Sequence, residues 1–127
     1  MTREHRVPDA SHPITVGPTQ GRVRVTVGDE VVADTTAALT LEEAGYPPVQ
    51  YVPLADVDPA LLRRSDTTTW CPYKGEATYH DLTAASGTAT DAVWSYADPF
   101  DAVAQIRGHV AFVPGTVEVR TGTEVTG

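Results

Sequence analysis

The sequence predicts a mainly β fold in a single domain. Strict alternation of apolar and polar residues in 22–27, short runs rich in valine, threonine and aromatic residues, and frequent glycine, proline and aspartate between those runs indicate many short strands. Helical periodicity is confined to two short stretches. A chain of 127 residues has the usual length of one domain and can bury a real core. An all-β sandwich or barrel-like arrangement follows.

The N-terminal segment, residues 1–20, is predicted to be an extended or partly disordered arm. It holds Pro8, Pro13 and Pro18 and shows little apolar periodicity. The folded domain is expected to span residues 21–122, with a C-terminal tail over residues 123–127.

A β-hairpin is predicted to open the domain. Three valines at alternate positions from Val23 to Val27 define one face of the first strand, and Arg22, Arg24 and Thr26 define the other. Gly28-Asp29 forms a turn into a second strand at 31–33, because glycine supplies the positive φ that two-residue hairpin turns need.

Seven further strands and two short helices complete the prediction. The strand-like runs are 38–41, 49–52, 67–70, 76–82, 92–96, 109–113 and 117–120. Pro114-Gly115 is a turn between the last two. Asp58-Pro59 and Asp98-Pro99 each place a side-chain acceptor before a proline suited to a first helical turn, which predicts helices over 60–64 and 100–106.

Composition excludes several classes of partner. The formal net charge of −8 repels nucleic acid and anionic lipid. A single cysteine cannot form an internal disulfide or a paired-thiolate zinc site, which favours a reducing cytoplasm. No apolar stretch is long enough for a signal peptide or a membrane span. No cofactor and no metal are expected, and the histidines lack ligand spacing.

The most distinctive segment is Trp70-Cys71-Pro72-Tyr73-Lys74-Gly75, which contains the only cysteine and the only lysine of the chain. Lys74 is a candidate to hold a phosphate or carboxylate, and Cys71 is a candidate nucleophile. Alternation places Lys74 on one strand face with Glu76, Thr78 and His80, where His80 could transfer a proton. The structural alternatives are a Lys74–Glu76 ion pair, a Cys71 that fills the core, and an ordinary surface histidine.

A magnesium site at Asp56-Val57-Asp58 is considered and rejected. Paired carboxylates hold magnesium in nucleotide-transferring enzymes. Here Pro53 and Pro59 place the pair in a turn, Asp58 is expected to cap a helix, and no glycine-rich phosphate loop precedes it.

Aromatic residues supply a second candidate feature. Trp94 and Tyr96 share a strand face, and Tyr79 and Trp70 can join them across strands. Such a group is usually core. Beside Lys74 it would instead form a flat apolar wall facing a cation, which suits a small aromatic or nucleotide-like anion.

Residues 71–79 match the pattern Cys-Pro-x-Lys-Gly-x-Ala-x-Tyr, which resembles the hallmark motif of the domain of unknown function family 427, also labelled a nucleotidyltransferase-type domain. The resemblance covers residues 22 to 120 approximately. It implies a β-tent-like fold, in which two antiparallel sheets meet at an angle around a groove. Zinc-binding relatives of that architecture use paired Cys-x-x-Cys knuckles, which this chain lacks.

The leading functional hypothesis is a groove that binds a small anionic or aromatic ligand. The residues expected to border it are Arg24, Lys74, Tyr79, Trp94 and Tyr96. One alternative is an enzyme, either of the nucleotidyltransferase type or one that uses Cys71 or Lys74 covalently. The other is a structural protein-interaction module in which Lys74 ties the Cys71-Pro72 turn to a carboxylate.

Overall fold

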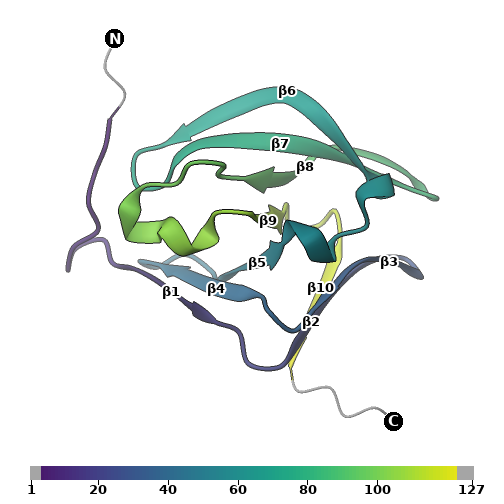
Figure 1. The fold of residues 1–127 in the computed structure, drawn as a ribbon, viewed down its shortest axis with the longest axis horizontal. Coiled ribbons are helices and arrows are strands. Elements are labelled where there is room, and N and C mark those ends of the chain that lie inside the picture. The colour runs from purple at the N-terminus through teal and green to yellow at the C-terminus, as the bar shows by residue number, and fades with distance from the viewer. Residues whose placement is uncertain (1–3, 123–127) are drawn as a thin grey trace.

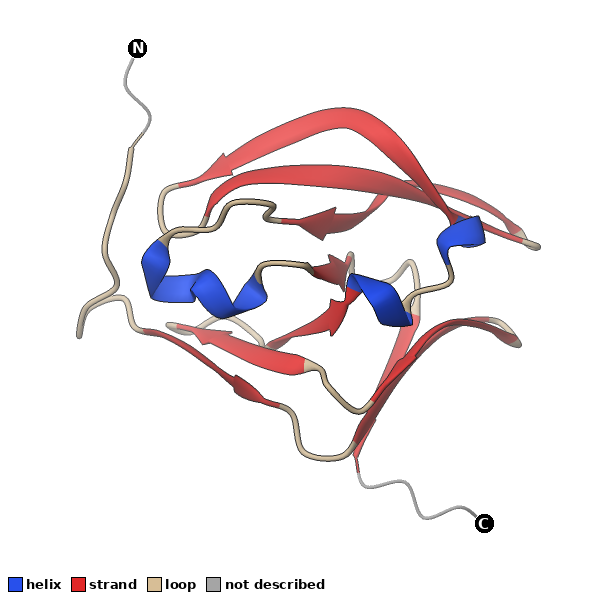
Figure 2. Ribbon diagram, viewed as in Figure 1, coloured by secondary structure: helices blue, strands red, loops and turns tan. Residues whose placement is uncertain are grey.

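A computed structural model describes residues 4–122 of the chain and confirms a mainly β single domain built from two antiparallel sheets (Figure 1, Figure 2). The strands are β1 (Ile14–Pro18), β2 (Arg22–Val27), β3 (Glu30–Thr35), β4 (Leu39–Glu43), β5 (Val49–Pro53), β6 (Leu62–Cys71), β7 (Gly75–Ala84), β8 (Gly87–Ser95), β9 (His109–Phe112) and β10 (Glu118–Gly122). Three short 3₁₀ helices connect them: η1 (Leu54–Asp56), η2 (Pro59–Leu61) and η3 (Asp101–Ile106).

The larger sheet has seven strands in the order β1-β4-β5-β9-β8-β7-β6, and the smaller has three in the order β10-β2-β3. Every strand pair is antiparallel. Figure 1 shows the long strands β6 and β7 arching over one side of the molecule, with β2, β3 and β10 on the other. Within the described residues, no helix has the length and apolar character needed to cross a membrane.

One buried cluster joins the two sheets. The alternation predicted in β2 is confirmed, because Val23 and Val25 are fully buried, whereas Arg24 between them is exposed. These valines pack with Val52 of β5 and Val93 of β8. Gly28, with φ of +58°, forms the predicted turn between β2 and β3.

A second buried cluster lies on the other face of the large sheet. Neighbouring residues on one strand point to opposite faces, so Tyr51 belongs to this cluster while Val52 belongs to the first. Val103 and Ile106 of η3 also belong to the second cluster. This face carries the candidate site.

The structure differs from the sequence prediction at the N-terminus. Within the predicted arm, residues 14–18 form β1, which pairs with β4 at the edge of the large sheet. The sequence does not predict this strand, because its alternation is short and ends in Gly17-Pro18. A strand at the edge of a sheet tolerates such a proline. The predicted tail, residues 123–127, lies outside the described residues.

The predicted helices also need correction. The Asp58 side chain accepts a hydrogen bond from the Ala60 amide as expected, but η2 ends at Leu61 and residues 62–64 belong to β6. Asp98 does not cap η3, whose N-cap residue is Phe100 and makes no side-chain hydrogen bond. The Asp98 carboxylate instead accepts a hydrogen bond from Arg107 at 3.1 Å.

Candidate functional site

The segment that contains the single lysine is a tight turn between β6 and β7. The Lys74 amide donates to the Cys71 carbonyl at 3.3 Å, and the Lys74 carbonyl accepts from the Phe100 amide at 3.0 Å. Gly75 closes the turn with φ of +112°, a conformation that side-chain-bearing residues rarely adopt. Because Lys74 lies in this turn, strand alternation does not direct its side chain. The predicted shared face with Glu76, Thr78 and His80 is therefore wrong, and Lys74 lines a cavity together with Tyr79.

Lys74 forms a buried ion pair with Glu43 at the end of β4. The Nζ–Oε1 distance is 2.5 Å, and the two side chains are 10% and 15% exposed. The other carboxylate oxygen of Glu43 lies 2.7 Å from Nε2 of His12, whose ring stacks on Tyr73. One carboxylate thus links the motif turn, β4 and the N-terminal segment.

The Glu43 carboxyl has a pKa below its ordinary value of 4.5. Burial by itself would raise this pKa, but the hydrogen bonds from Lys74 and His12, with the attraction of their charges, outweigh the effect of burial. A lowered folded-state pKa stabilises the fold above the ordinary pKa, and this contribution is lost as the pH falls through the folded-state value.

We therefore expect a Glu43→Gln variant to be less stable than the wild type at pH 7, and this difference to shrink as the pH falls below 4.5. Urea denaturation across this pH range measures the difference directly. Glu42→Gln is the matched control, since Glu42 is exposed next to Glu43. A difference between wild type and Glu43→Gln that stays constant down to acidic pH would contradict the assignment of the ion pair.

An aromatic-walled cavity of about 290 Å³ lies over this ion pair. Its lining comprises Leu41, Glu43, Tyr46, Pro47, Val49, Tyr51, Lys74, Tyr79, Trp94, Tyr96, Val113 and Pro114. The Trp94 indole Nε1–H donates to the Tyr51 hydroxyl at 3.3 Å, and the two rings meet edge to face. Burial raises the pKa of Tyr51 to about 12 and also raises the pKa of Tyr96. Both phenols therefore stay neutral and can donate hydrogen bonds at physiological pH.

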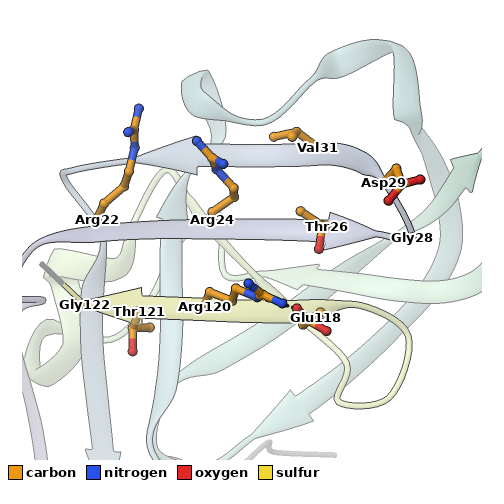
Figure 3. Close-up of a pocket in the computed structure, with 10 residues that line it drawn as sticks. All are labelled: Arg22, Arg24, Thr26, Gly28, Asp29, Val31, Glu118, Arg120, Thr121 and Gly122. Carbon is orange, nitrogen blue, oxygen red and sulfur yellow. Dashed lines mark hydrogen bonds and ion pairs between the residues drawn. The ribbon is translucent and has the colours of Figure 1, made fainter. Parts of the chain in front are cut away.

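The structure brings together four of the five residues predicted to bind a ligand: Lys74, Tyr79, Trp94 and Tyr96. Arg24 does not join them. It lies on the outer face of the small sheet and lines a separate cavity, where Figure 3 shows it on β2 near Arg120 of β10. Its Nη2 lies 3.2 Å from Oδ2 of Asp34, and Arg22 Nε lies 2.6 Å from Oδ1 of the same carboxylate. Burial by itself would raise the pKa of Asp34, but the hydrogen bonds from both arginines outweigh this effect and lower the pKa below its ordinary value.

The other candidate residues lie outside this cavity. Cys71 is partly buried against the second cluster, with its Sγ 3.8 Å from Lys74 Nζ. Trp70 donates from its indole to the Glu4 carbonyl at 2.7 Å and meets Phe100 edge to face. His80 lines no part of the cavity, and burial lowers its pKa.

The Asp56-Val57-Asp58 segment has the structural role that the sequence indicated. Asp56 accepts a hydrogen bond from the Thr35 hydroxyl at 2.7 Å, and Asp58 caps η2. Across residues 4–122, no group of three or more histidine, cysteine or acidic side chains is arranged to hold a metal ion.

Sequence reasoning missed Glu43, His12 and Tyr51. Glu43 had a usable signal, because Leu39, Leu41 and Glu43 share one face of β4, and a charge that continues an apolar face needs a partner. His12 had no such signal. It lies in irregular chain and meets Glu43 through the fold.

Together, these features define a small mainly β domain with an aromatic-walled cavity over a buried ion pair. A family model, NTP_transf_9, described as domain of unknown function DUF427, matches residues 15–123. The chain belongs to this family, as the motif resemblance indicated. A search of curated proteins found no match. The matched region begins inside β1, directly after Ile14, and includes Glu43, whereas His12 precedes it.

Proposed function

We propose that this domain binds a small, flat, uncharged ligand without covalent chemistry in the cavity over Lys74 and Glu43. The observation that carries the proposal is the ion pair itself, whose two side chains are largely buried yet line an aromatic cavity. A buried ion pair is weak evidence for a stabilising role, because apolar side chains of similar volume are often at least as stable. A recognition role gives it a reason to be there.

The ion pair offers a ligand a donor and an acceptor side by side. The Lys74 ammonium has three protons, and the described contacts give it Glu43 Oε1 and the more distant Cys71 sulfur. The Glu43 carboxylate has lone pairs beyond those facing Lys74 and His12. A primary amide or a ring amide matches this pattern, since its carbonyl accepts from the ammonium and its N–H donates to the carboxylate. An aromatic or amide plane would lie against Trp94 or Tyr79.

The charge balance narrows the original expectation of an anionic or aromatic ligand. Glu43 offsets the charge of Lys74, so an anion has to share Nζ with a carboxylate 2.5 Å away. Like charges at such distances repel, whereas an uncharged polar group meets no such penalty. A flat aromatic ligand without charge is therefore the first candidate, and an anionic ligand is the second.

The covalent and nucleotidyl-transfer alternatives have less support. A Schiff base requires Lys74 Nζ to leave Glu43 and lose a proton before it can attack a carbonyl. The Cys71 thiol packs against the second cluster, as expected for a core side chain. A nucleotidyltransferase would need Asp56 and Asp58 as paired carboxylates for magnesium. Here Asp56 accepts a hydrogen bond from Thr35, and Asp58 accepts one from the backbone of η2.

The structural-module alternative rests on one specific observation, which is that Lys74 ties the motif turn to β4 through Glu43. This reading predicts stability effects without ligand responses, so a binding experiment separates it from the proposal.

Titration with benzamide and benzoate, followed by the Trp94 indole N–H signal in NMR spectra, tests the proposed function. Wild type should bind benzamide more tightly than benzoate. Glu43→Gln should weaken benzamide about tenfold, the size expected for loss of one hydrogen bond to a charged group. The same variant should improve benzoate binding, because Lys74 loses its competing carboxylate.

Glu42→Gln, an exposed neighbour, should change neither affinity. A wild type that prefers benzoate would favour the anionic ligand instead. Binding of neither probe, with loss of stability in Glu43→Gln, would leave the structural module as the reading to keep.

A further inference from the structure

We infer that the site continues past Trp94 into a second, apolar cavity, and that the ligand is an amphiphile with a flat polar head and an apolar tail. This inference rests on the proposed function and names the class of ligand. The second cavity has a volume of about 320 Å³. Its lining residues are Val25, Pro48, Val49, Gln50, Val52, Trp94, Phe112, Pro114, Gly115, Val117 and Val119.

The two cavities are neighbours because Val49, Trp94 and Pro114 line both of them. Trp94 is held at this boundary by its hydrogen bond to Tyr51, which lines the first cavity. A molecule seated against Trp94 in one cavity therefore has the other within reach along the same side chains.

The second cavity exists because β5 and β9 separate from each other. Their pairing is limited to Val52↔Val110 and Pro53↔His109, while the earlier part of β5 pairs with β4. Pro48 precedes β5 and Pro114 follows β9 closely, and a proline has no N–H with which to extend a ladder. Both prolines line the opening. The sequence thus keeps the sheet open at this point.

The chemistry of the two cavities is complementary. Lys74 and Glu43 line the first, whereas among residues 4–122 no charged side chain lines the second, whose polar side chains there are Gln50 and the indole of Trp94. Apolar surface left facing such a space loses the contacts that a close-packed interior provides. An alkyl or similar apolar group would restore those contacts, and the shared wall makes the tail of the bound ligand the occupant to which we commit.

A series of 4-alkylbenzamides, unsubstituted, ethyl and butyl, tests the inference on the full chain by calorimetric titration. Each added methylene should tighten binding about fourfold if it becomes buried in the second cavity. Val117→Phe, which fills that cavity, should remove most of this gain while benzamide itself binds as before. Val31→Phe is the matched control, because Val31 lies exposed on the outer face of the small sheet.

Wild-type protein also provides a readout that needs no variant. Nuclear Overhauser effects should connect the terminal methyl of 4-butylbenzamide to methyl groups of Val117 and Val119. If all three amides bind equally and Glu43→Gln still weakens benzamide, the extension is overturned and the proposed function stands. If none of the amides binds, the proposed function fails, and the inference fails with it.

Discussion

Replacing Lys74 with methionine is expected to lower the free energy of unfolding by about 3 kcal/mol, because removal of one partner leaves a buried charge without its closest counterion. For a domain of this size, the melting temperature should fall by about 10 °C. Glu43 keeps its hydrogen bond with His12, which places the expected loss at the lower end of the usual range for a broken buried pair. Urea denaturation at pH 7 measures the effect.

The double variant Lys74→Met/Glu43→Met should be more stable than Lys74→Met alone, because it removes the uncompensated charge as well. Arg120→Met provides a control ion pair, since Arg120 and Glu118 interact at the surface with both side chains mostly exposed. That change should alter stability by less than about 1 kcal/mol. Equal losses in Lys74→Met and Arg120→Met would show that the Lys74–Glu43 pair behaves as an ordinary surface contact.

Local patterns in the sequence were sufficient to predict most of the strands. Alternation in residues 22–27 predicted β2 and its buried valines, and Gly28-Asp29 predicted the turn into β3. These features depend only on residues close in sequence, because successive side chains of a strand point to opposite faces of the sheet. The sequence did not predict β1, because its pattern is short and its pairing partner, β4, follows more than twenty residues later.

Strand alternation also explains why Arg24 lies away from the cavity. Val23 and Val25 turn into the core between the sheets, so Arg24 must face outward from the small sheet. The groove hypothesis included Arg24 as a ligand-binding residue, but the period of two in its own strand already placed Arg24 on the face opposite the buried valines. For Lys74, strand alternation gives the wrong face. Lys74 lies in a turn that Gly75 closes at positive φ, and the geometry of this turn sets the direction of its side chain.

The Lys74–Glu43 contact could not be predicted from local pattern. The two residues are 31 positions apart. They belong to β4 and to the turn between β6 and β7, which are not neighbours in the large sheet, so only the fold of the whole sheet brings them together. Local patterns indicate that each of these charges needs a partner, but the fold of the whole chain decides which partner it meets. The same holds for Tyr51 and Trp94, whose hydrogen bond spans 43 positions.

The helix η3 is held in place by packing, and this makes Ile106 important for the whole site. The helix has six residues, lacks a side-chain cap and contains a non-helical residue, Val103. Short helices of this kind have little stability of their own. Val103 and Ile106 are both 0% exposed and pack in the cluster that contains Tyr51 and Tyr96. The residue that precedes the helix, Phe100, donates its amide to the carbonyl of Lys74.

Ile106→Ala should therefore lower the free energy of unfolding by about 3 kcal/mol, within the range for a large buried side chain replaced by alanine. Loosening of η3 should also weaken benzamide binding, because Phe100 connects the start of η3 to the turn that holds Lys74. Leu54→Ala is the matched control, since Leu54 in η1 is 46% exposed, and its effect should stay within about 1 kcal/mol. Urea denaturation measures both losses. Similar losses in the two variants would mean that η3 is not anchored through Ile106, whereas a large loss in Ile106→Ala alone would support packing as its anchor.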